Sequence, residues 1–170
     1  IPALEIHPTA INNEWILPPS KSHLIRMLYL CALSKNKHTL QNFNDLGEDA
    51  ESMKRCLTQL GATFNPLENG IEIGGCGIEG FQRSPSVLYA GNSGTALRFL
   101  IGLSSRLNFL STVDGDATLR NRNHADLLNA ISPLGVSFSY GIEQGQLPIL
   151  VQGPWNGSEV SVDVSRSSQP

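Results

Sequence analysis

The sequence predicts an α/β fold built from a repeated unit in the order strand, helix, strand, helix, strand, strand. The first observation is that the same order of apolar patterns occurs at about residues 14–80 and again at about 81–155. The second is a local match, because LTQLGATF at 57–64 resembles ISPLGVSF at 131–138. A third unit begins at about 156–170, so we expect two full units and the start of another.

The first unit opens with a short apolar strand at 15–17, which leads into PPSKS, a turn rich in proline and hydroxyl residues. A helix is predicted over 23–34 with Ser22 as its N-cap, because a serine hydroxyl accepts a hydrogen bond from the free N–H groups of a helix start. Apolar positions at helical spacing predict one buried stripe along this helix. They are Leu24, Met27, Leu28, Cys31 and Ala32.

The remainder of the first unit contains a strand, a helix and a hairpin. A strand is predicted at 38–43 and a helix over 48–60. The helix is expected to end at Gly61, because glycine readily adopts the left-handed conformation that follows many helices. Strands at 62–67 and 71–75 flank the turn signal ENG, which predicts a hairpin.

The second unit repeats this order around the turn GNSGT, which stands where PPSKS stands in the first unit. Its strands are predicted at 87–90, 108–113, 136–140 and 147–153, and its helices at 96–105 and 124–134. The alternating strand at 159–164 and the turn SRSSQ then open the third unit. A strand and turn without their helix leave an apolar face uncovered, so we expect the natural protein to be longer.

Composition excludes several function classes. With 40% hydrophobic and 16% charged residues, the 170-residue chain is expected to bury a sizeable core as a soluble domain. A net charge of -3 argues against a general nucleic-acid binder, which needs a basic excess to displace counterions. No stretch approaches the roughly 20 apolar residues that span a bilayer, and no basic and apolar leader opens the sequence. A cytoplasmic protein without membrane contact is therefore expected.

The sequence contains no motif typical of a metal site or of covalent catalysis. The three cysteines lack CxxC or Cys/His spacing, and the four histidines are scattered. The sequence also lacks a Ser/His/Asp order, GxxxxGK[ST] and GxGxxG, so hydrolase, P-loop and dinucleotide interpretations have no support.

Three turns of similar chemistry, PPSKS, GNSGT and SRSSQ, each lie between a predicted strand and a helix start. Free backbone N–H groups and the positive end of the helix dipole favour phosphate or carboxylate at such places. Taken singly, each turn is weak evidence, because serine or threonine between a strand and a helix is usually just a helix cap. Three turns in register favour a shared anion-binding pocket.

Cationic residues accompany these turns. Lys21 lies inside the first, Arg26 and Arg98 lie one turn into the helices that come after the turns, and Arg166 lies in the third. A solvated surface charge is the alternative for each, because lysine and arginine are mostly exposed. Lys21 and Arg26 are the strongest candidates for anion binding.

Two further arginines, Arg120 and Arg122, precede the helix predicted over 124–134, where a cation opposes the helix dipole. This unfavourable position suggests that they serve a ligand, since an arginine forms bidentate pairs with carboxylate or phosphate. Glu48 and Asp49, in contrast, open the helix over 48–60, where carboxylates favour the dipole and a structural role is expected.

The segments LPPSKSHLIR, YAGNSGTALRFL, LRNRNHADLL and DVSRSSQ resemble the EPSP synthase (5-enolpyruvylshikimate-3-phosphate synthase) family over nearly the whole chain. The resemblance implies the enolpyruvyl transferase fold, an inside-out barrel of two domains, each with three βαβαββ units. Residues 1–13 would form an amino-terminal strand that packs with the second domain. Residues 14–170 would form an incomplete first domain whose partner, the carboxy-terminal domain, is absent from this sequence.

The resemblance also implies a reaction of the shikimate pathway, in aromatic amino-acid and chorismate biosynthesis. The carboxyvinyl group of phosphoenolpyruvate passes to the 5-hydroxyl of shikimate 3-phosphate and phosphate is released, without a metal or organic cofactor. Two catalytic residues are implied, Lys21 and Arg122. The substrate-binding residues implied are Lys21, Ser22, Arg26, Asn92, Gly94, Arg122, Ser167, Ser168 and Gln169. The acid and base of the family lie in the second domain, so the chain alone is expected to be inactive.

Some positions depart from the family pattern. Asn123 and Phe99 stand where proline is usual, Leu24 and Ile25 replace a polar pair, and Pro170 replaces a larger apolar residue, which suggests a divergent member. Three alternatives stay open: a non-catalytic anion-binding module, a purely structural repeat, and a relative of UDP-N-acetylglucosamine enolpyruvyl transferase.

Overall fold

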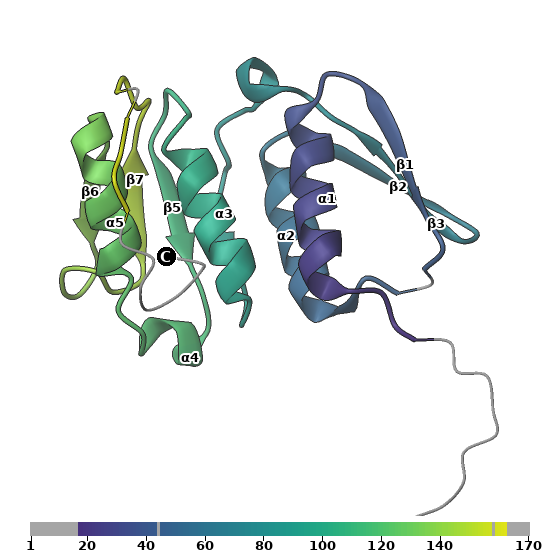
Figure 1. The fold of residues 1–170 in the computed structure, drawn as a ribbon, viewed down its shortest axis with the longest axis horizontal. Coiled ribbons are helices and arrows are strands. Elements are labelled where there is room, and N and C mark those ends of the chain that lie inside the picture. Colours follow the sequence, from purple (N-terminus) through teal and green to yellow (C-terminus); the bar gives the residue numbers. More distant parts are fainter. Residues whose placement is uncertain (1–16, 44, 158, 163–170) are drawn as a thin grey trace, which may run out of the picture.

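A computed structural model describes residues 17–43, 45–157 and 159–162 of the chain, and its arrangement is shown in Figure 1. The helices are α1 (Lys21–Leu33), α2 (Gly47–Gln59), α3 (Gly94–Ser104), α4 (Ala117–Arg120) and α5 (Ala125–Ile131), with short 3-10 turns at Ile78–Gly80 and Ser132–Leu134. The strands are β1 (Lys37–Gln41), β2 (Thr63–Leu67), β3 (Gly70–Gly74), β4 (Leu88–Tyr89), β5 (Ser111–Asp114), β6 (Ser137–Tyr140) and β7 (Ile149–Gln152).

The strands form two sheets, in the orders β1-β3-β2 and β4-β5-β7-β6. In the first sheet β3 lies between β1 and β2, and in the second sheet β7 lies between β5 and β6. All four of these pairings are antiparallel. The second sheet also carries β4 parallel to β5. The predicted α/β class is confirmed, and the corresponding strands of the two halves have the same order.

Helix α1 begins earlier than the sequence predicts. The N-cap is Ser20, not Ser22, because the carbonyl oxygen of Ser20 already accepts the first helical hydrogen bond, from the backbone N–H of Leu24 at 2.9 Å. Ser22 therefore lies within the first helical turn, where its backbone N–H is one of the groups without an intrahelical partner.

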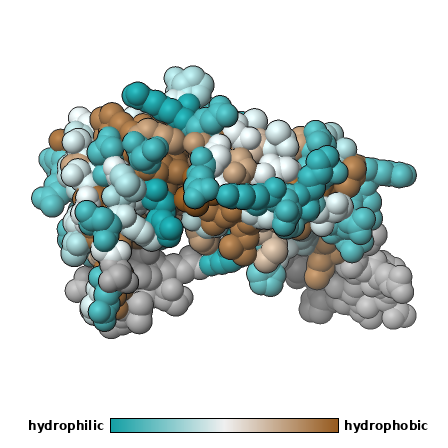
Figure 2. Space-filling view, turned by 90° about the horizontal axis from the view of Figure 1, so that it is seen from above, coloured by the Kyte–Doolittle hydropathy of each residue, from teal (hydrophilic) through white to brown (hydrophobic). Residues whose placement is uncertain are grey.

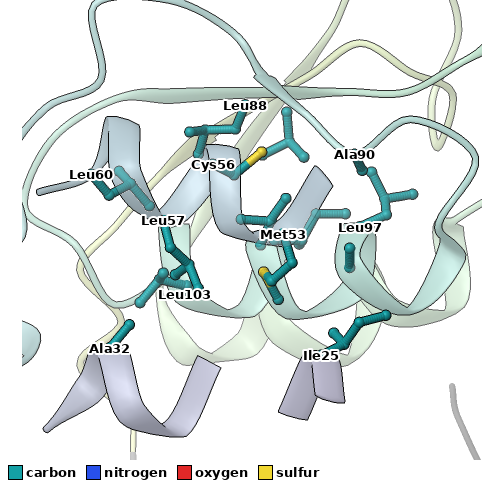
Figure 3. Packing of buried hydrophobic residues seen from close by; sticks show 14 of the residues in the cluster. Ile25, Ala32, Met53, Cys56, Leu57, Leu60, Leu88, Ala90, Leu97 and Leu103 are labelled. Atoms are coloured by element: carbon teal, nitrogen blue, oxygen red, sulfur yellow. The ribbon is translucent and has the colours of Figure 1, made fainter. Parts of the chain in front are cut away.

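The buried face of α1 is rotated slightly from the predicted stripe. Met27, expected to be buried, is 42% exposed, whereas Ile25 is fully buried. The two residues lie at opposite edges of the stripe, and contact with α2 selects the Ile25 side. Figure 3 shows Ile25 and Ala32 of α1 close to Met53 and Leu57 of α2, with Leu97 and Leu103 of α3 completing the cluster.

The glycines that end the second helix of each half behave as predicted. Gly61 has a φ of 112°, and its N–H and that of Ala62 donate to the carbonyl oxygens of Thr58 and Leu57 at 3.0 Å, which forms a Schellman ending. The helix predicted over 124–134 is α5 followed by a 3-10 turn. It ends at Gly135, whose φ is 90°. These matching ends support the correspondence between the two halves.

Helix α3 occupies the middle of the structure and contacts α1 and α2 as well as β5 and β7 (Figure 1). Its N-cap is Ser93, whose buried hydroxyl accepts a hydrogen bond from the backbone N–H of Ala96 at 3.2 Å. Because α3 is anchored on both sides, its amino-terminal end is a fixed point between the two halves.

Several predictions concern residues at the ends of the chain. The amino-terminal strand at 1–13 and the third turn at 165–169 lie outside the described residues. Leu17, the last residue of the strand expected at 15–17, belongs to no strand. The strand expected at 159–164 is not found over its described part, 159–162, because no neighbouring strand pairs with it there. Within the described ranges, no helix is long and apolar enough to cross a membrane.

Candidate functional site

The turns that precede α3 and α4 lie beside each other. Strands β4 and β5 are parallel, so they end at the same edge of their sheet. The backbone N–H of Asp116 donates to the carbonyl oxygen of Gly91 at 2.9 Å, and the side-chain amide of Asn92 donates to a carboxylate oxygen of Asp116 at 2.6 Å. These bonds join the turn after β4 to the turn after β5.

The start of α1 lies on the same side of the molecule as α4 (Figure 1). Figure 2 looks at the opposite end of the structure, where apolar residues are interspersed with polar ones. The elements that carry the predicted site residues, α1 and α4, therefore have these residues at the end of the molecule that faces away from the view in Figure 2.

Three of the residues singled out in the sequence meet at the start of α3. The guanidinium Nη1 atoms of Arg98 and Arg122 lie 3.5 and 3.8 Å from the point that a β-carbon would occupy at Gly94. Arg98 also donates to the carbonyl oxygen of Gly94, at 3.4 Å. Because Gly94 has no side chain, both guanidinium groups can lie close to the start of the helix.

The charge at this point is strongly positive. Two guanidinium groups gather at the amino-terminal end of a helix of 11 residues, where the helix dipole is also positive. His124 adds no charge at neutral pH, because burial lowers its pKa and the nearby Arg98 and Arg122 lower it further. Its Nε2 carries the proton, since it lies 3.1 Å from the carbonyl oxygen of Leu119, which can only accept. Such a cluster suits a phosphate or carboxylate.

The negative group nearest to this cluster is Asp116. One of its carboxylate oxygens caps α4 by accepting from the backbone N–H of Leu119 at 3.0 Å, and the other accepts from Asn92. The bond from Leu119 is the main reason that the pKa of Asp116 is lowered, with smaller contributions from Asn92 and Arg122. Asp116 therefore stays ionised and balances part of the positive charge. The sequence interpretation missed this residue, although an aspartate one residue before a helix is a recognisable cap.

Lys21 and Arg26 lie on α1. The ammonium group of Lys21 forms an ion pair with the carboxylate of Asp49 at 2.7 Å, and 69% of the lysine side chain is exposed. Asp49 was expected to have a helix-start role, and it does lie in the first turn of α2, but it also holds this lysine. Arg26 donates to the carbonyl oxygen of Ser22 at 2.8 Å, and its guanidinium lies 5.6 Å from the ring centroid of Phe99.

Arg120 is engaged by the protein itself. Its Nε donates to Asp114 at 3.0 Å and its Nη2 donates to the other oxygen of the same carboxylate. The guanidinium of Arg122, in contrast, has no hydrogen-bond partner among the residues that the structure describes. These hydrogen bonds raise the pKa of Arg120. Arg120 and Arg122, both suggested as ligand-binding residues by their place in the sequence, therefore have different surroundings, and the suggestion that Arg120 binds a ligand stays a prediction.

The remaining candidates lie elsewhere. Arg166, Ser167, Ser168 and Gln169 are outside the described residues. Among the residues that the structure does describe, no group of three or more His, Cys, Asp or Glu side chains is arranged to hold a metal ion.

A cavity of about 500 Å³ adjoins the cluster between the first turns of α2 and the turn at Gly91 and Asn92. Its lining includes the carboxylates of Asp45, Glu48, Asp49 and Glu51, and one guanidinium, that of Arg55. This acidic lining disfavours an anion. The start of α3, with its two guanidinium groups, is therefore better suited to an anion than this cavity is.

Comparison with known proteins identifies the family of this chain. The family model described as EPSP synthase (3-phosphoshikimate 1-carboxyvinyltransferase) matches residues 7–170. The chain belongs to the EPSP synthase family. This result favours the resemblance seen in the sequence motifs over a purely structural repeat.

Curated members of the family align with almost the whole chain. Proteins named 3-phosphoshikimate 1-carboxyvinyltransferase from Deinococcus radiodurans and Chlamydia pneumoniae are 35% and 29% identical to it, each over 96% of the chain, which covers 37% and 36% of their own lengths. A solved EPSP synthase from Acinetobacter baumannii superimposes with a TM-score of 0.82 at 27% identity, covering 91% of this chain and 36% of that one. The chain thus spans little more than a third of the length of these EPSP synthase relatives.

Proposed function

We propose that this chain forms the amino-terminal part of a 3-phosphoshikimate 1-carboxyvinyltransferase. The enzyme would transfer the carboxyvinyl group of phosphoenolpyruvate to the 5-hydroxyl of shikimate 3-phosphate and release inorganic phosphate, in the cytoplasm. The observation that carries the proposal is the meeting of Arg98 and Arg122 at the start of α3. Both substrates are phosphorylated carboxylates, and such ligands need this concentration of fixed cations and N–H donors.

The proposed roles depend on position and charge. Arg122 and the backbone at Gly94 would bind phosphoenolpyruvate, and Lys21 would neutralise negative charge that develops on it during transfer. Ser22 and Arg26 would bind shikimate 3-phosphate from α1, and Ser167, Ser168 and Gln169 would complete that site. The side-chain amide of Asn92 donates to Asp116, which leaves its second N–H and its carbonyl oxygen as the groups we assign to substrate. No metal or organic cofactor enters this scheme.

The alternatives differ in substrate and in turnover. A UDP-N-acetylglucosamine enolpyruvyl transferase would use another acceptor, whereas the relatives that align with this chain are named for 3-phosphoshikimate. A non-catalytic anion-binding module would bind the same ligands without releasing phosphate. Release of phosphate that depends on the acceptor therefore separates all three hypotheses.

The test is an assay of the full-length protein that carries this sequence. Phosphate release is expected only when phosphoenolpyruvate and shikimate 3-phosphate are both present, and UDP-N-acetylglucosamine should not replace the acceptor. The 170-residue chain alone should release no phosphate and bind shikimate 3-phosphate weakly by calorimetry, because we assign the acid and base to another domain. Turnover by this chain alone, or none by the full-length protein, would contradict the proposal.

Substitution of Gly94 tests the location of the anion site. A β-carbon there would meet its neighbours at ordinary contact distances of 3.5 to 3.8 Å, so Gly94→Ala should fold normally. The added methyl group would nevertheless occupy the space between the helix start and the two guanidinium groups. Loss of about one charge-assisted hydrogen bond should weaken phosphoenolpyruvate binding by about tenfold or more in titrations of the full-length protein.

Gly102 provides a matched control in the same helix, since a β-carbon there meets nothing within 4 Å. Gly102→Ala should stabilise α3 by about 0.5–1 kcal/mol through the higher helix propensity of alanine. It should leave ligand affinity unchanged. Equal affinities for Gly94→Ala and Gly102→Ala would place the anion away from the start of α3.

A further inference from the structure

Helix α4 is a single turn that leads to Arg122 (Figure 1). A helix this short is not stable by itself, so tertiary contacts must hold it. Asp116 supplies one of them by capping the helix, and the buried side chain of Leu119 supplies another. The third is the pairing of Asp114, the last residue of β5, with Arg120, the last residue of α4.

The carboxylate of Asp114 is a rigid anchor. Asp114 is the last residue of β5, which pairs with β4 on one side and with β7 on the other. Its side chain is only 8% exposed, and the backbone N–H of Gly115 donates to it at 2.8 Å. Arg120 approaches this fixed group with two donors in the fork geometry that restricts both distance and orientation. The end of α4 is thereby tied to the sheet.

The tie between α4 and the sheet also restrains Arg122, two residues beyond Arg120. The backbone N–H of Arg122 donates to the carbonyl oxygen of Leu119 at 3.1 Å, so the path of the chain at Arg122 continues directly from α4. Arg122 points toward Gly94 and Arg98, although two guanidinium groups repel each other. A loosely held loop would let Arg122 move away from Arg98 until an anion was bound. A loop tied to β5 keeps the cation in place beforehand.

We propose that Asp114 and Arg120 are a positioning pair, which fixes the guanidinium of Arg122 beside the start of α3 in readiness for an anion. This inference rests on the proposed function, and it assigns to Arg120 a role exerted through Arg122. The side chain of Arg120 is 47% exposed, so direct contact with a ligand is the competing explanation. A second competing explanation is that Arg120 only contributes to the stability of the fold.

A double-mutant cycle distinguishes these explanations. The variants are Arg120→Lys, Arg122→Lys and the combination, each made in the full-length protein and compared by kcat/KM for phosphoenolpyruvate. Arg120→Lys keeps the charge but loses the fork, and it should lower kcat/KM by about tenfold when Arg122 is present. In the Arg122→Lys background the same change should cost less than about twofold, because residues that act through each other are not additive.

The control is Arg106→Lys, which alters an arginine just beyond the other end of α3, where its guanidinium lies 4.6 Å from the ring centroid of Trp155. It should change neither kcat/KM nor its dependence on Arg122. Equal losses from Arg120→Lys in both backgrounds would overturn the proposal. Such losses would show that Arg120 either contacts the ligand directly or only stabilises the fold. A lower melting temperature of Arg120→Lys would indicate the second of these roles.

Two additions keep the test decisive. If Arg120→Lys does not fold, the neutral pair Asp114→Asn with Arg120→Gln replaces it, since it removes the ion pair without leaving a buried charge. The same cycle is also measured on the dissociation constant for inorganic phosphate. If the wild-type protein binds phosphate but does not turn over, the proposed function fails while the phosphate cycle still decides the positioning role. Absence of both turnover and phosphate binding overturns both.

Discussion

Replacing Arg122 with glutamine in the full-length protein is expected to lower kcat/KM by about a hundredfold to a thousandfold, the loss typical of one preorganised donor to developing charge. Arg122 lies at the start of α3 next to Arg98. Glutamine keeps a polar side chain of moderate length but removes the positive charge and the bidentate fork. The measurement is steady-state kinetics with both substrates varied, and the larger effect should appear with phosphoenolpyruvate.

The fold should tolerate this change. Within the described part of the chain, the guanidinium of Arg122 has no hydrogen-bond partner, and it lies near the like charge of Arg98. Its removal should leave the melting temperature unchanged or slightly higher. Arg83→Gln serves as the control, since Arg83 is exposed on the connection before β4. Full activity of Arg122→Gln would remove the start of α3 from the mechanism.

The sequence predicted the parts of this fold that depend on local chemistry. Gly61 and Gly135 end their helices in the left-handed conformation. Glycine adopts this conformation more readily than other residues, so these helix ends can be predicted from the sequence. Which of Ile25 and Met27 is buried could not be predicted, because helical spacing locates an apolar stripe but does not show which edge of the stripe faces a neighbouring helix. Which of Ser20 and Ser22 is the N-cap of α1 could not be predicted either, since either hydroxyl suits a helix start.

The site divides in the same way. Turn composition predicted a shared anion site, which stays a prediction, and the structure shows that Gly94 and Arg122 lie together. The bond between Asn92 and Asp116 and the pairing of Asp114 with Arg120 were not predictable, because both cross a turn rather than a helix face. Helix α4 is too short to show a period. Its presence separates Arg120 from Arg122 and gives them different surroundings.

Replacing Lys21 with methionine is the second change with a large expected effect. Methionine resembles the apolar stem of lysine but lacks the ammonium group, so kcat/KM should fall by about a hundredfold or more if Lys21 neutralises charge during transfer. Stability should hardly change, because an exposed ion pair such as Lys21 with Asp49 contributes about 0–1 kcal/mol. Kinetics and thermal unfolding of the full-length protein measure the two quantities separately.

Lys35 offers a closely matched comparison at the other end of α1. Its ammonium group pairs with Glu79 at 2.9 Å and its side chain is 70% exposed, against 2.7 Å and 69% for Lys21 with Asp49. The two lysines are equally exposed, but Asp49 is 21% exposed and Glu79 is 79% exposed, so thermal unfolding of both variants must accompany the kinetics to separate loss of the ion pair from loss of a reacting group. Lys35→Met should keep full activity. Equal activity of the two variants would mean that the amino-terminal end of α1 takes no part in the reaction, whereas loss only in Lys21→Met would tie the chemistry to the end where Gly94 and Arg122 meet.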